Sequence, residues 1–113
     1  MVSDASRRTW RRFAREVERR FGEWRRVEDY AQALGYSART LTRASLEAAG
    51  APAKEVIERR VVLEAKRLLA HSSRPVGAIA LDLGFSEPTN FVKFFRRREG
   101  MAPLAFRQRQ GGR

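Results

Sequence analysis

The feature that most constrains this fold is an internal repeat. The segment VEDYAQALGYSARTLTRASLEAAG, residues 27–50, returns in altered form as VGAIALDLGFSEPTNFVKFFRRREG, residues 76–100. The triplet Gly-Tyr-Ser at 35–37 corresponds to Gly-Phe-Ser at 84–86, and the second copy carries one extra residue just after its serine. A chain built on such a repeat is expected to form two similar supersecondary units.

Each copy has the pattern of two helices joined at a glycine corner. Apolar residues recur three and four positions apart on both sides of the glycine, which is the spacing of amphipathic helices. Glycine supplies the positive φ of a sharp corner, the aromatic residue after it fills the angle, and the small Ala31 and Ala80 let the helices cross closely. A helix-turn-helix has this pattern, and its second helix fits the major groove of DNA. A purely structural αα-corner needs the same residues, so one copy alone does not decide the function.

The rest of the chain is also predicted to be helical, because we find no alternating β-branched runs and no Asn-Gly or Asp-Gly hairpin turns. A first helix carries an apolar stripe and is ended by Gly22; the stripe consists of Trp10, Phe13, Val17, Phe21 and Trp24. Six further helices are predicted: 27–34 ended by Gly35, 38–49 capped by Ser37 and closed by Gly50, 52–71 with Pro52 in its first turn, 76–83 ended by Gly84, 87–99 capped by Ser86 and closed by Gly100, and a short one from Pro103.

The chain is strongly basic. Its 24 Lys and Arg residues against 13 Asp and Glu give a formal net charge of +11 and a pI of about 11.5. Such a chain is expected to bind a polyanion, which is DNA, RNA or an acidic membrane face. Charge alone does not choose among these, but together with two matched helix-turn-helix patterns it favours DNA.

Several classes of function are disfavoured by what the chain lacks. Its 113 residues suit one domain, and the absence of cysteine excludes disulfides and thiolate metal sites. No apolar run is long enough to span a membrane, and the N-terminal MVSDASRRTW lacks the apolar stretch of a signal peptide. The one histidine, His71, has no second metal ligand or nucleophile at a suitable spacing. We therefore expect no enzyme, no cofactor and no metal, and a cytoplasmic location.

The second copy carries the most specific motif of the chain. It contains an Ile-Ala pair, Leu-Gly-Phe, two Phe four positions apart, Gly, then Pro and a final Arg; the residues are Ile79, Ala80, Leu83, Gly84, Phe85, Phe91, Phe95, Gly100, Pro103 and Arg107. In these residues, and in YAQALGYSARTLTR of the first copy, the chain resembles the DNA-binding module of the AraC/XylS-type bacterial transcription regulators. The resemblance runs from about Phe13 to Arg107 and includes Ala65, Leu68 and Leu69 of the long helix.

The resemblance implies an all-α fold of about seven helices, with two homeodomain-like helix-turn-helix units joined by a long linker helix. Residues 1–113 would form a single DNA-binding module, made of a first subdomain at 7–50, the linker helix at 52–71 and a second subdomain at 75–110. Two departures from the family pattern concern the first unit. Ser45 stands where the family usually has Phe, with Leu46 a partial substitute, and an Arg usual in the linker falls on Val61, with Arg60 one place early.

The recognition helices are expected at about 38–49 and 87–99. Arg39, Thr42 and Arg43 share one face of the first, and Thr89 and Lys93 occupy the matching stripe of the second, preceded by Pro88. Arginine binds guanine O6 and N7 with two hydrogen bonds, threonine offers a hydroxyl or methyl group, and Pro88 suits a thymine methyl. The resemblance implies that these six residues contact bases. The alternative for each is a solvated helix residue.

Phosphate contacts are expected near the two helix starts. Ser37 and Ser86 begin helices whose free N–H groups attract anions. Asn90, Arg96 and Arg97 are candidate backbone clamps. The arginines between Arg7 and Arg26 either add nonspecific attraction or solubilise a helix whose other side is core.

The predicted function is sequence-specific binding of double-stranded DNA that regulates transcription. A linker of about 18 residues is about 27 Å long, and major-groove faces recur about 34 Å apart, so the two helices are expected in adjacent major-groove segments. The alternative is a nonspecific nucleic-acid-binding protein that uses charge alone.

RNA polymerase as a partner is implied by the resemblance only. The chain is either a free-standing regulator or the C-terminal module of a longer one. Its first residues favour the second possibility. An effector or dimerisation domain, if there is one, would lie outside the chain. When bound, it would be associated with the nucleoid.

Overall fold

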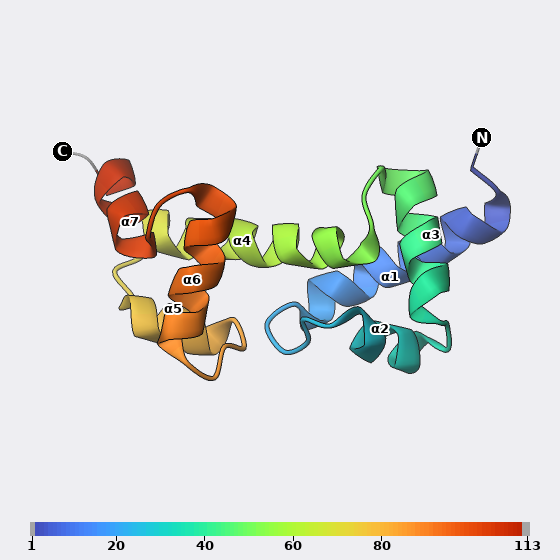
Figure 1. Ribbon diagram of the computed structural model, residues 1–113, viewed down its shortest axis with the longest axis horizontal. Helices are drawn as coiled ribbons and strands as arrows, with labels where there is room; N and C mark the ends of the chain where they lie inside the picture. Colours follow the sequence, from blue (N-terminus) through green and yellow to red (C-terminus); the bar gives the residue numbers. More distant parts are fainter. Residues whose placement is uncertain (1, 112–113) are drawn as a thin grey trace. The chain divides into compact units, whose positions relative to one another are not determined.

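The computed structural model describes residues 2–111, and within them it contains seven helices and no strand (Figure 1). The all-α prediction is therefore confirmed. The helices are α1 (Asp4–Arg20), α2 (Val27–Leu34), α3 (Ala38–Ala49), α4 (Ala53–His71), α5 (Val76–Asp82), α6 (Pro88–Glu99) and α7 (Pro103–Gly111). The chain divides into two compact units, the first ending at Arg60 and the second beginning at Val61, so the division falls within α4.

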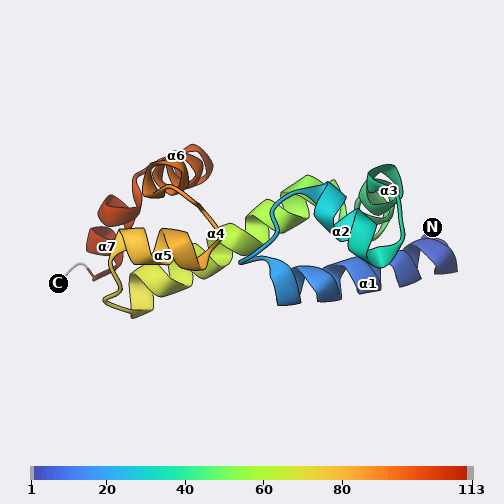
Figure 2. The same ribbon diagram turned by 90° about the horizontal axis from the view of Figure 1, so that it is seen from below.

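In the first unit α1 packs against both α2 and α3 (Figure 2). Phe13, Tyr30 and Leu41, one from each of these helices, are fully buried, and Ile57 of α4 joins them. The rings of Phe13 and Tyr30 meet edge to face with centroids 5.5 Å apart, and the Tyr30 hydroxyl donates to the carbonyl of Trp24 at 2.9 Å. This core fixes the crossing of α2 and α3.

The second unit has its own core, rich in phenylalanine. Phe91 and Phe95 of α6 are fully buried, and their ring centroids lie 6.0 Å apart. Phe85 lies 5.4 Å from Phe91, and Phe106 of α7 lies 5.6 Å from Phe95. Ile79 and Ala80 are fully buried. This core holds α6 between α5 and α7.

The two corners share one hydrogen-bond geometry. The Tyr36 N–H donates to the Ala31 carbonyl at 3.0 Å, and the Phe85 N–H donates to the Ala80 carbonyl at the same distance. Gly35 has φ 77° and Gly84 has φ 87°, which is the left-handed region that glycine enters without strain. The predicted glycine corners are thus confirmed in both copies.

Two details of the predicted elements were wrong. The first helix ends at Arg20 with Phe21 as C-cap, so Gly22 does not end it and Trp24 lies beyond it. The N-cap of α6 is Glu87 rather than Ser86, and no side chain caps this helix. Proline accounts for the second difference: Pro88, the first helical residue, has no N–H to satisfy, and it holds Glu87 in extended backbone.

Candidate nucleic-acid interface

The helix α3 begins with a complete side-chain cap. Ser37 is extended, with φ −85° and ψ 156°, and its Oγ accepts a hydrogen bond from the Thr40 N–H at 3.1 Å. The same hydroxyl donates to Thr40 Oγ1 at 2.9 Å. Ser37 is therefore confirmed as N-cap, and its side chain stabilises the first turn of the helix.

The outward face of α3 displays two of the three residues predicted to read bases. Arg39 and Arg43, one turn apart, are exposed, while Leu41 and Ala44 are buried beneath them. Thr42 is only half-buried, at the flank of the exposed face. Arg39 and Arg43 pair with no carboxylate among residues 2–111, so both guanidinium groups are available to an external acceptor.

Ser45 and Leu46 differ from the pattern of a buried aromatic at this turn. Ser45 is fully buried and its hydroxyl donates to the Leu41 carbonyl at 2.8 Å, so its polar atom is satisfied within the helix. Leu46 is 49% exposed. The suggestion that Leu46 partly replaces the missing aromatic is therefore wrong, since Leu46 lies outside the core.

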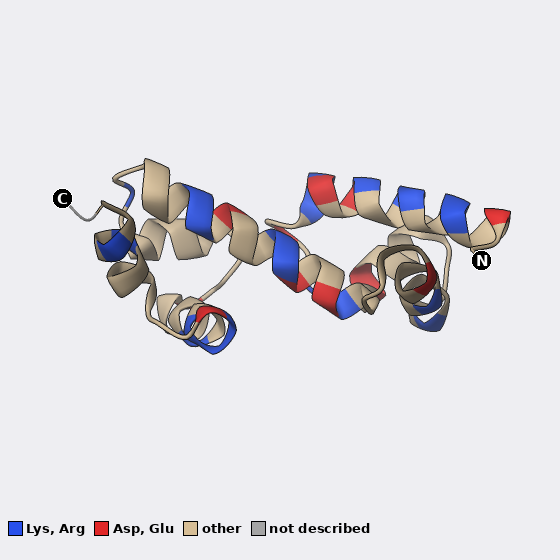
Figure 3. Ribbon diagram, turned by 90° about the horizontal axis from the view of Figure 1, so that it is seen from above, with Lys and Arg blue, Asp and Glu red and all other residues tan. Residues whose placement is uncertain are grey.

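The helix α6 presents the matching face of the second unit. Phe91, Phe94 and Phe95 face inward, whereas the predicted contact residues are all exposed; these are Pro88, Thr89, Asn90, Lys93, Arg96 and Arg97. The guanidinium of Arg97 lies 5.6 Å from the Phe94 ring centroid. Arg96, Arg97 and Arg98 occupy the last turn, where cations interact favourably with the helix dipole (Figure 3).

The predicted phosphate residues are exposed but differ in their local roles. Ser37 directly precedes α3 and Ser86 lies two residues before α6, and only Ser37 caps its helix. At α6 the Asn90 N–H donates to the Glu87 carbonyl at 3.0 Å. Ser86 therefore remains an exposed hydroxyl beside a helix start, with no capping role.

Sequence reasoning missed long-range contacts of arginine, among them those of Arg12 and Arg107. Arg12 of α1 donates from Nη1 to the Tyr36 hydroxyl at 2.9 Å. Arg107 of α7 donates from Nε to the Leu69 carbonyl at 3.0 Å and from Nη2 to the Ser72 carbonyl at 3.2 Å, which satisfies the C-terminal end of α4. The only available signal for the first was the Tyr36 hydroxyl, which its counterpart Phe85 lacks. The motif included Arg107 but gave no partner for it.

The contacts of α4 also show what stands at the second departure from the family pattern, residues 60 and 61. Val61 is fully buried, and Arg60 donates from Nε to Glu18 Oε2 at 2.6 Å. The Arg60 guanidinium also lies 4.2 Å from the Phe21 ring centroid. Arg60 thus ties α4 to α1 and Phe21 within the first unit.

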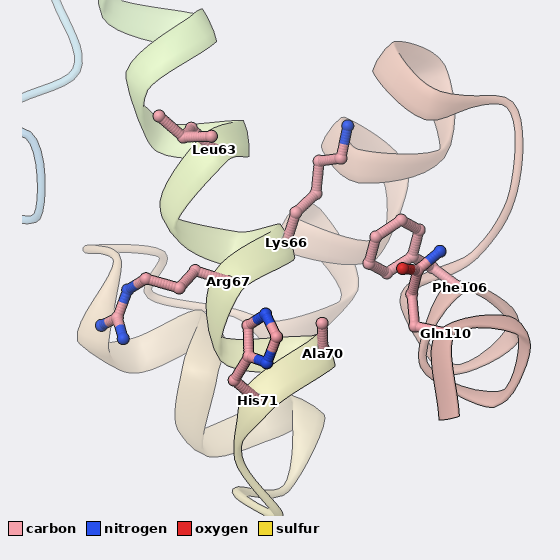
Figure 4. Close-up of a pocket in the computed structure, with 7 residues that line it drawn as sticks. All are labelled: Leu63, Lys66, Arg67, Ala70, His71, Phe106 and Gln110. Carbon is pink, nitrogen blue, oxygen red and sulfur yellow. The ribbon is translucent and has the colours of Figure 1, made fainter. Parts of the chain in front are cut away.

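A shallow hollow of about 300 Å³ lies between α4 and α7 in the second unit (Figure 4). Lys66, Arg67, His71 and Phe106 line it. Lys66 pairs with Glu99 at 3.0 Å and Arg67 with Glu64 at 2.6 Å. Lys66 and Arg67 are thus engaged in ion pairs within the unit.

Residues 2–111 contain neither a metal-binding cluster nor a membrane-spanning helix. No group of three or more His, Cys, Asp or Glu side chains is arranged to hold a metal ion. None of the helices described is both long enough and apolar enough to cross a bilayer.

Two glycine-cornered units that each expose a basic second helix define a protein with two helix-turn-helix units. A family model described as "Helix-turn-helix domain" matches residues 30–109. The chain belongs to the AraC-type helix-turn-helix family.

Relatives and solved structures agree with this family. The chain is 30% identical to the uncharacterized HTH-type transcriptional regulator YisR of Bacillus subtilis over 95 residues, 84% of this chain and 33% of YisR. It is 33% identical to the HTH-type transcriptional activator RhaS of Escherichia fergusonii over 92 residues, 81% of this chain and 33% of RhaS. The chain therefore spans about a third of the length of the curated relatives it matches.

Among solved structures, the DNA-binding domain of AdpA, the global transcriptional factor, in complex with a target DNA matches 97% of this chain and 96% of that chain, with a TM-score of 0.77 and 29% identity. The C-terminal domain of AraT, a response regulator from Geobacillus stearothermophilus, matches 96% of this chain and 87% of that chain, with a TM-score of 0.81 and 21% identity. The second of these likenesses concerns the fold alone.

Proposed function

We propose that this chain binds double-stranded DNA in a sequence-specific manner and thereby regulates transcription. The observation that carries the proposal is the matched exposure of the outward faces of α3 and α6, each projecting from a glycine corner with its opposite face buried. The AdpA domain, bound to its target DNA, supports it. The net charge of +11 supplies the nonspecific attraction on which such binding rests.

Base recognition is assigned to the exposed faces of the two helices. Arg39 and Arg43 of α3 suit guanine O6 and N7, and Thr42 reaches the groove from the flank. In α6 we assign base contacts to Pro88, Thr89 and Lys93. Backbone contacts fall to Ser37, Ser86, Asn90, Arg96 and Arg97, because a phosphate accepts hydrogen bonds from hydroxyl, amide and guanidinium groups.

The two recognition helices are proposed to occupy adjacent segments of the major groove. With its 19 residues, α4 is about 28 Å long, comparable with the spacing of about 34 Å between successive groove faces. A hydroxyl-radical footprint of the bound duplex tests this. Protection limited to one groove segment would contradict it.

The test of specificity is selection of bound sequences from a random duplex pool at near-physiological salt. The wild type is expected to yield a two-part motif with centres about 10 base pairs apart. Arg43→Ala should relax one half of the motif and Lys93→Ala the other, because each removes a base contact worth about 1–3 kcal/mol. Arg109→Ala removes a positive charge from an exposed position of α7 and should leave both halves intact.

A different outcome would favour the alternative of a nonspecific binder. In that case no motif would emerge, and Arg43→Ala, Lys93→Ala and Arg109→Ala would lower affinity by similar factors, since each removes one charge. The net charge alone would then account for binding.

The remaining parts of the proposal follow from the family. Its members are regulators, so we assign the chain no catalytic activity and place it in the bacterial cytoplasm, where it reaches the nucleoid. RhaS is named a transcriptional activator, and a contact with RNA polymerase is proposed here on that ground. In-vitro transcription from a promoter bearing the selected motif, with and without the chain, tests whether binding changes transcript yield.

A further inference from the structure

An arginine of α1 lies at the corner that leads into α3. The Arg12 guanidinium donates to the Tyr36 hydroxyl at 2.9 Å, and its central carbon lies 5.2 Å from the Tyr36 ring centroid. Tyr36 directly precedes Ser37, the N-cap of α3. A cation from a distant part of the sequence is therefore held by the side chain that directly precedes the N-cap of α3.

Tyr36 is itself fixed in place, so it can position the guanidinium. Its N–H donates to the Ala31 carbonyl at 3.0 Å, which anchors the backbone at the corner. A hydrogen bond with Thr9, a buried residue of α1, lowers the pKa of the Tyr36 hydroxyl, and the positive charges of Arg12 and Arg8 lower it further. The phenol therefore bridges α1 and the corner.

The Arg12 guanidinium keeps most of its hydrogen-bonding capacity. The side chain is exposed, and a guanidinium has five N–H donors, of which Tyr36 receives one. The ion pairs of α1 use Arg19, Arg20, Glu16 and Glu18, and none of those among residues 2–111 uses Arg12. A guanidinium held in one orientation with free donors suits the two-point binding of a phosphate.

The matching position of the second unit cannot form this hydrogen bond. Phe85, the counterpart of Tyr36, has no hydroxyl and is buried, with its ring 5.4 Å from both Phe91 and Phe94. The arrangement is therefore particular to the first unit and is not a requirement of the corner itself. This contrast argues against a purely structural role for the Tyr36 hydroxyl and Arg12.

We infer that Arg12, positioned by Tyr36, binds one backbone phosphate of the DNA beside the bases that α3 reads, and so fixes the register of α3. This inference rests on the proposed function and deepens it: it assigns a phosphate site to α1, outside the recognition helices. Its ligand is a phosphodiester of duplex DNA.

The test uses the full chain and the duplex selected as described above. One backbone phosphate at a time is replaced by a neutral methylphosphonate, and affinity is measured for the wild type, Arg12→Ala, Tyr36→Phe and Arg15→Ala. Arg15 is an exposed arginine of the same helix and serves as the matched control. Circular dichroism and the thermal midpoint check that each variant is folded.

The wild type should lose about tenfold in affinity when one particular phosphate is neutralised, and Arg12→Ala should lose nothing further at that position. Arg12→Ala should also reduce the slope of log affinity against log salt by about 0.9, the value of one phosphate contact. Tyr36→Phe keeps the positive charge of Arg12 but removes the hydrogen bond that positions its side chain. It should therefore weaken binding about threefold, with an unchanged slope of log affinity against log salt. Arg15→Ala should remain as sensitive as the wild type at every position.

Equal losses for Arg12→Ala and Arg15→Ala, or an unchanged pattern of phosphate sensitivity in Arg12→Ala, would overturn this inference while leaving sequence-specific binding intact. Should Arg12→Ala fail to fold, the decision passes to Tyr36→Phe: affinity equal to that of the wild type would overturn the inference. A selection that yields no motif would overturn the proposed function, and this inference with it.

Discussion

Ser45 and Phe95 occupy matching places in the two copies and are both fully buried, although their side chains differ greatly in volume. The two units take the aromatic side chains of their cores from different elements. In the first unit Phe13 of α1 packs on Tyr30 of α2, and Trp24 packs on the same ring at 5.4 Å. In the second unit α6 itself supplies three phenylalanines. The family pattern indicated the missing aromatic of the first unit, whereas Phe13 and Trp24, which pack on Tyr30 there, precede the repeat.

The two tyrosines of the chain are expected to ionise in separate steps. Burial raises the pKa of Tyr30 well above its usual value of about 10, whereas the hydrogen bond with Thr9 lowers the pKa of Tyr36. Absorbance of the phenolate followed against pH should therefore show one transition below about 10 and one well above it. Tyr36→Phe should remove the first transition and Tyr30→Phe the second.

The free energy of unfolding should fall at high pH because of Tyr30. Its folded-state pKa is raised, so its contribution is complete below the unfolded pKa of about 10 and is lost as pH rises beyond that value. Tyr36 acts with the opposite sign, since its lowered pKa favours the folded state once its hydroxyl ionises. Urea unfolding of wild type and Tyr36→Phe between about pH 8 and pH 11 separates the two effects. If the phenolate absorbance of the wild type showed a single transition near pH 10 for both tyrosines, this assignment would be contradicted.

At the scale of elements, most boundaries followed from local chemistry. Gly35, Gly50 and Gly100 all adopt positive φ at the ends of helices, where the sequence placed helix stops. The start of α6 was misjudged because the extra residue of the second copy moves the cap from Ser86 to Glu87, and only the backbone preference imposed by Pro88 reveals this. Local sequence thus predicts the last residue of a helix more directly than it predicts which group caps the free N–H groups of the first turn.

Two glycine substitutions should have opposite effects on stability. A Cβ on Gly35 would meet no atom within 4 Å, so only its φ of 77° requires glycine, and Gly35→Ala should lower the free energy of unfolding by about 1–2 kcal/mol. Gly77, inside α5, has no positive φ, and its Cβ would meet Pro88 Cγ at an ordinary 3.9 Å. Gly77→Ala should therefore raise the free energy of unfolding by about 0.5–1 kcal/mol. Urea denaturation measures both, and a loss of stability in Gly77→Ala would contradict the reasoning.

At the scale of the whole molecule, the division within α4 gives each unit a core of its own. Phe13, Tyr30 and Leu41 belong to one core, and Ile79, Phe91 and Phe95 to the other. The repeat predicted two similar substructures, the helical pattern of 52–71 predicted the long helix between them, and the family resemblance implied that this helix is a linker. Neither indicated the contacts of Arg12, Arg60 and Arg107, because a partner tens of residues away leaves no periodic pattern in the sequence.

Weakening one core should leave the other largely unaffected. Phe13→Leu should raise hydrogen exchange at buried amides of α1 to α3, while exchange in α5 to α7 stays close to that of the wild type. Phe91→Leu should do the reverse, and the stability losses of the double variant should add within about 0.5 kcal/mol. Exchange that rises equally throughout the chain in either single variant would show that the two cores unfold as one.

The separation between the outward and inward faces of α3 and α6 has a consequence for how the sequence can evolve. Residues 39 and 43, and their counterparts 89 and 93, are exposed, while the side chains that hold each helix in place lie on its other side. Replacement at the exposed positions therefore does not open a cavity in either core. With base recognition assigned to these positions as proposed above, a gene encoding this chain would acquire new binding preferences at a few codons, one unit at a time, while the fold that presents them is kept.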